Sequence, residues 1–286
     1  MNLLVTGSNG QLGKEIKKIS TDFSSYNLFL CDFNELNICD KNAVLSYFKI
    51  NDINCVINCA AYTNVDEAES NFELANNVNN IGVLNLVDAC LKNNSKIIHI
   101  STDYVFDGNK KSAYLENDTT KPIGVYGKTK FLGEKHITDS KVKGIVVRTS
   151  WLYSAFGNNF VKTILKLSDE KKEIKVVNDQ FGSPTNAADL ADSCLKIIGK
   201  LEKHNYEISK IYHFSNLGSC SWYEFAKSII LISKKNCKII PVSSAKFITK
   251  AKRPKFSVLS KQKIIDDFGL NILGWEQSLK KYFSVE

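Results

Sequence analysis

The chain has 286 residues, of which 43% are hydrophobic and 24% are charged, and its formal net charge is +8. These values are ordinary for a soluble globular protein, and no apolar run approaches the roughly 20 residues that a membrane-spanning helix needs. The lysine excess is either a solvated surface or a field that attracts an anionic ligand. Because the only arginines are Arg148 and Arg253 and no basic stripe interleaves with aromatic residues, nucleic-acid binding is not expected.

The N-terminus and the cysteines indicate the compartment. Met1 leads directly into an apolar strand, without the basic, apolar and cleavage regions of a signal peptide, which predicts a cytoplasmic protein. The eight cysteines form no C-x-x-C pair, and no histidine lies at metal-finger spacing. Cys31, Cys55 and Cys59 lie in apolar runs, where a reduced cysteine behaves as a small hydrophobic side chain. We therefore predict reduced, structural cysteines.

The first half of the chain alternates strand and helix patterns. Apolar runs without alternation predict strands at residues 2–6, 26–31, 54–59, 96–100 and 144–149. Apolar residues at helical spacing predict helices at 11–19, 41–49, 72–92 and 126–137. Strands of this kind, separated by helices, predict an α/β fold with a doubly wound parallel (Rossmann) sheet that is covered on both faces. We expect the strand order 3-2-1-4-5, with further strands beyond it.

The second half is less regular. The patterns predict helices at residues 159–167, 186–198 and 221–232, the last opened by a serine cap, and short strands at 174–177 and 210–214. We predict that residues 1–150 form an NAD(P)-binding Rossmann core, to which a segment at about 174–200 returns. Residues 151–286 would mainly form a smaller C-terminal substrate-binding lobe, interleaved with that core.

A glycine-rich turn follows the first predicted strand. Gly7, Gly10 and Gly13 have the spacing G-x-x-G-x-x-G, which allows a tight turn and a close approach of the backbone to a pyrophosphate. Asp32 ends the second strand, about 20 residues further on, where an acid usually binds the ribose 2′-hydroxyl. Such an acid favours NADH, although Lys14 and Lys41 could admit NADPH. The alternatives are a turn without ligand and a solvated loop acid.

Tyr126 and Lys130 are four residues apart on a predicted helix and would therefore lie on one face. There an ammonium can stabilise a phenolate and make the phenol acidic enough to act near neutral pH. Thr102 follows the fourth strand, where a hydroxyl can donate a hydrogen bond to a substrate carbonyl. Each feature alone could be a surface helix or an ordinary turn. Together with the glycine turn they predict a nicotinamide-dependent enzyme that moves a hydride to or from a sugar-like carbonyl.

Ordered blocks along most of the chain resemble the short-chain dehydrogenase/reductase superfamily and, more closely, the dTDP-4-dehydrorhamnose reductase family. The first blocks are V-T-G-S-N-G-Q-L-G near the start, I-N-C-A-A-Y-T-N-V-D-E-A-E from residue 57 and S-T-D-Y-V-F-D-G from residue 101. The later blocks are P-I-G-V-Y-G-K-T-K from residue 122, R-T-S-W-L-Y from 148, N-N-F from 158, D-Q-F-G-S-P-T from 179 and R-P-K-F-S-V-L from 253.

This resemblance implies reduction of dTDP-4-dehydro-L-rhamnose to dTDP-L-rhamnose with NADPH or NADH, in dTDP-rhamnose and surface polysaccharide biosynthesis. Tyr126 would protonate the oxygen formed at sugar C4, Lys130 would lower the pKa of Tyr126 and bind the nicotinamide ribose, and Thr102 would hydrogen-bond the carbonyl. The cofactor would also contact Gly7, Gly10, Gln11, Leu12, Gly13, Asp32, Asp40, Ala61, Tyr62 and Thr63.

The resemblance also implies substrate contacts and a metal. Asp103 and Trp151 would lie against the substrate, and Arg253 would face its diphosphate, for which a guanidinium offers a bidentate fork. The alternatives are a core tryptophan and a surface arginine. Some similar proteins carry magnesium at a homodimer interface, where Glu15 would be one ligand. Asp189 would be the second ligand, although its side chain is one carbon shorter than the glutamate usual at this place. The alternative is that Glu15 only stabilises the N-terminus of its own helix, where a negative charge is favourable.

Three rival functions remain open at this stage. Sugar-nucleotide dehydratases of the superfamily resemble T-D-E where this chain has Thr102-Asp103-Tyr104, and the missing acid argues against dehydration. A reductase of a different nucleotide-linked 4-keto sugar would keep every motif. A non-catalytic regulatory subunit of the same fold, like that of methionine adenosyltransferase, would bind cofactor without turnover.

Overall fold

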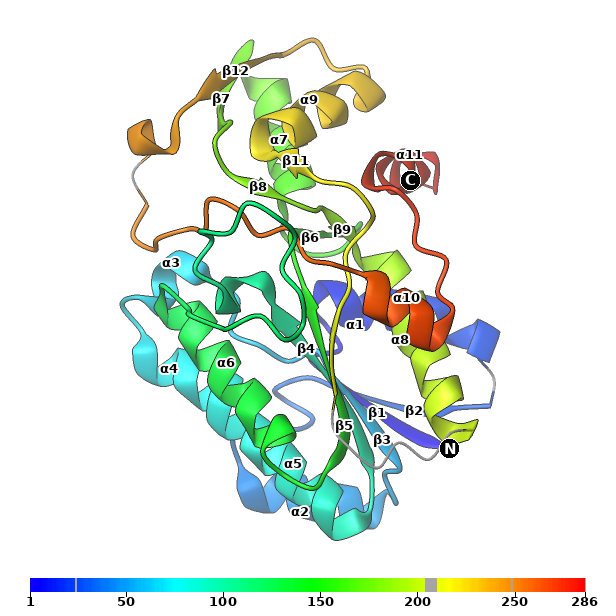
Figure 1. Cartoon of the computed structure of the whole chain (residues 1–286). Helices are drawn as coiled ribbons and strands as arrows, with labels where there is room; N and C mark the ends of the chain where they lie inside the picture. The colour runs from blue at the N-terminus through cyan, green and yellow to red at the C-terminus, as the bar shows by residue number, and fades with distance from the viewer. Residues whose placement is uncertain (24, 204–209, 248, 286) are drawn as a thin grey trace.

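The computed structural model describes residues 1–23, 25–203, 210–247 and 249–285. At its centre lies a sheet of six strands, all parallel, in the order β2-β1-β3-β4-β5-β10 (Figure 1). The strands are β1 Asn2–Thr6, β2 Asn27–Cys31, β3 Cys55–Asn58, β4 Lys96–Thr102, β5 Lys143–Thr149 and β10 Lys210–His213. The predicted α/β class and parallel sheet are confirmed.

The predicted strand order is wrong at β3, which lies between β1 and β4 rather than at the edge beyond β2. All four residues of β3 are buried, whereas Cys31 is the one buried residue of β2. A strand whose residues are buried on both faces belongs inside the sheet, so β3 occupies the interior and β2 forms the edge.

Helices cover both faces of the sheet. One face carries α1 Gln11–Ile19, α8 Ala187–Lys203 and α10 Gln262–Phe268. The other carries α2 Lys41–Ile50, α5 Gly82–Asn93 and α6 Val125–Thr138. Because successive side chains of a strand point to opposite faces, Leu3 and Val5 pack with the first group and Leu4 with the second. The sequence did not predict α10.

A smaller group of elements, all from residues after 150, forms the upper part of Figure 1. Its core packs around the parallel pair of β7 and β12 and three helices. The elements are α7 Phe160–Glu170, β7 Glu173–Val177, α9 Trp222–Ser233, β12 Lys238–Val242 and α11 Trp275–Val285. Ser221 caps α9 with a full capping box, as the sequence predicted. Two short pairs complete this region: β6 Leu152–Tyr153 with β9 Thr185–Asn186, and β8 Phe181–Gly182 with β11 Cys220–Ser221.

The predicted helix at residues 72–92 contains a change of pitch. It consists of α4 Phe72–Asn76, a π-helical turn Asn77–Ile81 and α5, while a short α3 Val65–Ala68 precedes it. Asn79 in the π turn is buried, and its carboxamide bonds the backbone N–H of Tyr62 at 2.8 Å and the Tyr62 carbonyl at 3.1 Å. The π turn thus fixes the loop that follows β3.

All eight cysteines are free thiols, as expected. Within residues 1–23, 25–203, 210–247 and 249–285, none of the helices combines the length and apolar character that a membrane crossing demands.

Candidate active site

The glycine turn joins β1 to α1 and leaves no room for side chains. Gly7 has φ +65°, and a Cβ there would lie 2.6 Å from the Ala60 nitrogen. A Cβ at Gly13 would lie 2.5 Å from the Gly7 carbonyl oxygen. Gly10 is the N-cap of α1 and has no side chain to cover the first N–H groups of the helix. The turn therefore presents bare backbone and a helix N-terminus, which suits an anionic group.

Asp32 lies beside this turn, as predicted. Its carboxylate accepts hydrogen bonds from the backbone N–H groups of Asn9 at 2.9 Å and Phe33 at 2.8 Å. The acid at the end of β2 is thus held against the loop that carries the glycines.

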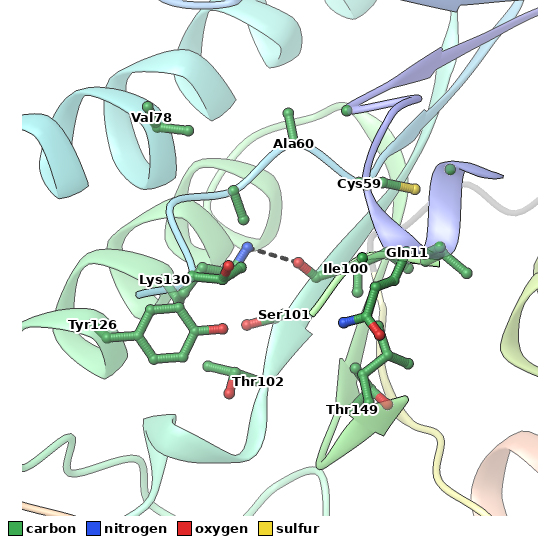
Figure 2. Close-up of a pocket in the computed structure, with 18 of the residues that line it drawn as sticks. Gln11, Cys59, Ala60, Val78, Ile100, Ser101, Thr102, Tyr126, Lys130 and Thr149 are labelled. Atoms are coloured by element: carbon green, nitrogen blue, oxygen red, sulfur yellow. Dashed lines mark hydrogen bonds between the residues drawn. The ribbon is translucent and has the colours of Figure 1, made fainter. Parts of the chain in front are cut away.

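A pocket of about 860 Å³ opens at the carboxyl ends of the strands, within the size range of sites for cofactors and small molecules. Among the predicted residues that line it are Gly7, Gly10, Gln11, Leu12, Gly13, Asp32, Ala61, Thr63, Thr102, Asp103, Tyr126, Lys130 and Trp151. Figure 2 shows Tyr126 and Lys130 reaching from α6 toward Ser101 and Thr102 at the end of β4, with Gln11 on the opposite side. Residues from six separate segments of the sequence therefore line one pocket.

Tyr126 is a neutral phenol in this pocket. Burial raises the pKa of Tyr126 to about 12, and the Asp103 charge acts in the same direction, while a hydrogen bond with Thr102 works against them. The sequence predicted that Lys130 would lower the pKa of Tyr126. That expectation is wrong, because desolvation of the phenol dominates.

Lys130 is buried, and its Nζ donates to the Ile100 carbonyl at 2.7 Å (Figure 2). Burial lowers the pKa of Lys130 to about 8, although the charges of Glu134 and Cys59 oppose the shift. The Nζ also lies 3.3 Å from His99 Nε2, a neighbour that the sequence analysis missed. A histidine inside the apolar run of β4 was the available signal.

Glu134 and Arg148 form a buried ion pair below Ser101. Arg148 donates from Nε to Oε1 at 2.9 Å and from Nη2 to Oε2 at 2.7 Å, and each residue is 1% exposed. Ser101 Oγ donates to the same Oε1 at 2.5 Å. The pair therefore connects α6, β5 and the end of β4 under the pocket.

Trp151 lies at the boundary of the two lobes. Its indole stacks on Trp222 with ring centroids 3.5 Å apart and planes 9° apart, and its backbone has φ +49°. A Cβ at Gly182 would lie 2.5 Å from the Trp151 ring, so a glycine is required there. Trp151 is partly buried and lines the pocket.

Arg253 forms an ion pair with Asp66. Its Nη2 donates to Oδ2 at 2.7 Å and its Nη1 to Oδ1 at 3.3 Å. Asp66 lies on α3, next to Val65, which lines the pocket, whereas Arg253 is not among the described residues that line it. The structure thus places Arg253 at a contact between the Rossmann core and the later segment, near the pocket but turned to a carboxylate.

Two residues predicted at the cofactor have other contacts. Asp40 is the N-cap of α2, where Oδ1 accepts from the backbone N–H groups of Asn42 and Ala43, both at 3.0 Å. Tyr62 is held by Asn79. Neither is among the described residues that line the pocket.

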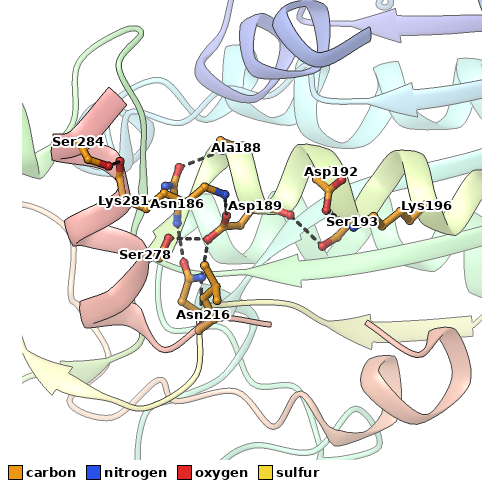
Figure 3. A network of polar contacts seen from close by, with 11 residues as sticks. Asn186, Ala188, Asp189, Asp192, Ser193, Lys196, Asn216, Ser278, Lys281 and Ser284 are labelled. Atoms are coloured by element: carbon orange, nitrogen blue, oxygen red, sulfur yellow. Dashed lines mark hydrogen bonds and ion pairs between the residues drawn. The ribbon is translucent and has the colours of Figure 1, made fainter. Parts of the chain in front are cut away.

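Asp189, one of the two magnesium ligands that the resemblance suggests, is engaged by other side chains of the same chain. Asp189 Oδ2 accepts from Asn216 Nδ2 at 2.8 Å and Ser278 Oγ at 2.5 Å, and Oδ1 pairs with Lys281 Nζ at 3.4 Å (Figure 3). This carboxylate therefore ties α8 to α11, and its oxygens are engaged. In the described part of the chain, no group of three or more His, Cys, Asp or Glu side chains is arranged to hold a metal, and we derive no step through one.

The parallel sheet, the glycine turn and the Tyr126–Lys130 pair beside Thr102 define a member of the short-chain dehydrogenase/reductase class. The model of the family described as RmlD substrate binding domain matches residues 1–285. The chain belongs to this family, the dTDP-4-dehydrorhamnose reductases.

Three proteins are similar to this chain over nearly its whole length. A dTDP-4-dehydrorhamnose reductase of Aggregatibacter actinomycetemcomitans is 40% identical over 97% of each chain. The spore coat polysaccharide biosynthesis protein SpsK of Bacillus subtilis is 37% identical over 98% of this chain and 96% of its own. The crystal structure of the Bacillus anthracis reductase in complex with NADP has a TM-score of 0.93 and 38% identity, covering 100% of this chain and 99% of its own.

Proposed function

We propose that this protein reduces dTDP-4-dehydro-L-rhamnose to dTDP-L-rhamnose with NADPH or NADH. The observation that carries the proposal is the meeting of Tyr126, Thr102 and Lys130 at the carboxyl end of β4, in one pocket with the glycine turn. The residues fit a dinucleotide, because the bare backbone at Gly7 and Gly10 opens on the N-terminus of α1. A reduced nicotinamide, when bound, supplies the hydride.

The chain's own residues would orient the sugar and deliver the proton. Tyr126 keeps its proton at neutral pH, which suits an acid that protonates the C4 oxygen. The Thr102 hydroxyl, which donates to Asp103 at 3.1 Å in the ligand-free protein, would turn to the same oxygen. The ammonium of Lys130 would stabilise the phenolate left behind. Trp151 would pack against the sugar ring.

Tyr104 argues against the dehydratase alternative. It occupies the position of the dehydratase acid and lines the pocket, with its ring edge-on to Tyr126 at 5.5 Å. Burial and the Asp103 charge raise the pKa of Tyr104 well above that of a free phenol, so it stays protonated and cannot act as a carboxylate would. Reduction is therefore the chemistry that the pocket supports.

The test is consumption of NADPH and of NADH with freshly prepared dTDP-4-dehydro-L-rhamnose, with the product identified as dTDP-L-rhamnose. Tyr126→Phe should cut turnover by about 10²–10⁴, the usual contribution of a positioned acid, and leave cofactor binding nearly intact. Tyr114→Phe is a matched control, because it removes a phenol hydroxyl that bonds Asp107 outside the pocket. Normal turnover in Tyr126→Phe would refute the assignment. Cofactor binding by the wild type without turnover of any 4-keto sugar would favour a regulatory subunit.

A further inference from the structure

Four buried polar side chains form a chain that ends at Lys130. Thr6 Oγ1 donates to Asn58 Oδ1 at 2.7 Å, Asn58 Nδ2 lies 2.9 Å from His99 Nδ1, and His99 Nε2 lies 3.3 Å from Lys130 Nζ. These residues come from β1, β3, β4 and α6, and each is at most 1% exposed. Polar groups buried this deeply are costly unless they are paired, so the order of donors and acceptors along the chain matters.

The backbone of Ala60 fixes that order. Its N–H donates to Asn58 Oδ1 at 3.2 Å, and a backbone amide can only donate. The Asn58 carboxamide is therefore oriented with its oxygen toward Ala60 and Thr6 and its NH₂ toward His99. Because that NH₂ is a donor, His99 Nδ1 must accept.

A neutral imidazole that accepts at Nδ1 carries its hydrogen at Nε2. His99 is neutral near pH 7, because burial, reinforced by the charge of Lys130, holds the pKa of His99 well below its ordinary value. The Nε2–H therefore points at the Nζ of Lys130. An ammonium has only donors to offer to this N–H, whereas a neutral amine has a lone pair that accepts it.

The charged form of Lys130 needs a different arrangement. For Lys130 to donate to Nε2, the hydrogen of His99 must move to Nδ1, where it would face the Asn58 NH₂. Relieving that conflict requires Asn58 to turn over and lose the bond from Ala60. The Ile100 carbonyl accepts from Lys130 in either form and does not discriminate.

We propose that Thr6, Asn58 and His99 are positioning residues that favour the neutral amine of Lys130 in the ligand-free protein and thereby set the alkaline limit of the reaction. The second half of this statement rests on the proposed reductase function. The other titratable groups that face Lys130 are Cys59 after β3 and, on α6, Glu134 and Tyr126, and the first two stabilise the ammonium. Since the ammonium is the form that supports Tyr126, activity should fall as the pH rises through about 8.

Asn58→Asp reverses the polarity of the chain with almost no change of shape. A carboxylate accepts from Ala60 and Thr6 with one oxygen and from His99 with the other, so the hydrogen of His99 moves to Nδ1 and Nε2 becomes an acceptor for the ammonium. The alkaline limb of the kcat/KM profile, which reports the free enzyme, should move upward by about one pH unit, a tenfold gain in proton affinity. His213→Asn is the matched control, because His213 is equally buried but contacts Arg148 and the Tyr114 carbonyl. The alkaline limb of the pH profile of this variant should not move.

Nitrogen-15 NMR of the imidazole rings gives a readout independent of turnover. The chain has four histidines, and His99→Asn assigns the signals of His99 by their loss. At pH 9, above the pKa of Lys130, the wild type should show the hydrogen on Nε2, and Asn58→Asp should show it on Nδ1. A wild-type hydrogen on Nδ1 at pH 9, or a doubly protonated ring at pH 7, would overturn the proposal, as would an unmoved alkaline limb in a folded Asn58→Asp. If that variant does not fold, the wild-type spectrum decides. Absence of any sugar reduction would refute the proposed function and leave the tautomer measurement valid.

Discussion

Glu134→Gln removes one charge from the ion pair beneath the pocket. The variant leaves the Arg148 guanidinium, 1% exposed, without its counter-charge, and replaces one of the two carboxylate oxygens that Arg148 contacts at 2.9 and 2.7 Å. Removing one partner of such a buried pair costs about 3–5 kcal/mol. At roughly 2 °C per kcal/mol for a chain of this size, Tm should fall by about 6–10 °C.

Thermal and urea unfolding, followed by circular dichroism at pH 7, measure this loss. Lys196→Ala is the control, because the Lys196–Asp192 pair is solvent-exposed. This variant should change the free energy of unfolding by less than about 1 kcal/mol. The double variant Glu134→Leu with Arg148→Met should recover most of the loss, since it removes both charges and retains volume. A Glu134→Gln protein within about 1 kcal/mol of the wild type would refute the reasoning.

Two further predictions concern the pocket. Gly7→Ala should weaken NADPH binding at least about tenfold in a fluorescence titration, because its Cβ would lie 2.6 Å from the Ala60 nitrogen. Gly269→Ala is the control, because Gly269 also has a positive φ, +53°, but lies far from the pocket. Equal affinities of the two variants for NADPH would contradict the prediction. Burial raises the pKa of Asp103 to about 6, so the folded protein binds the proton more tightly than the unfolded chain. The free energy of unfolding should therefore fall by on the order of 2 kcal/mol as the pH rises from about 4 to about 6. Urea unfolding at these two pH values measures the fall, and an Asp103→Asn protein that shows the same fall would argue against the prediction.

Hydrophobic periodicity and the glycine turn predicted the strand ends and the residues that lie at them. The glycine turn, Asp32, Thr102, Tyr126 and Lys130 line one pocket because the carboxyl ends of parallel strands meet at one edge of a sheet. Strand and helix periodicity located these ends along the chain. The site could therefore be assembled from the sequence without knowledge of any distant contact.

Partners far apart in sequence could not be predicted in this way. Arg253 pairs with Asp66, and Asp189 with Asn216 and Ser278, and no local pattern in the sequence identifies these partners. The position of β3 depended on burial along both of its faces, which periodicity does not report.

The hydrogen-bonded series of side chains Thr6, Asn58, His99 and Lys130 did leave a signal in the sequence. Asn58 and His99 interrupt the apolar runs of β3 and β4, and a polar residue in a strand buried on both faces must find a partner there. The sequence does not identify the partner, because the predicted strand order places β3 at the edge of the sheet.

The position of β10 in the sequence affects how the protein folds during synthesis. This strand closes the sheet against β5, and α8 and α10 cover one face, yet all three lie after residue 186. A nascent chain that stops before residue 210 therefore shows an open strand edge at β5 and, until α10 is made, part of its apolar face. Its core is completed only after α10 has been made, so a nascent chain that lacks α10 is the species most exposed to aggregation and to capture by chaperones.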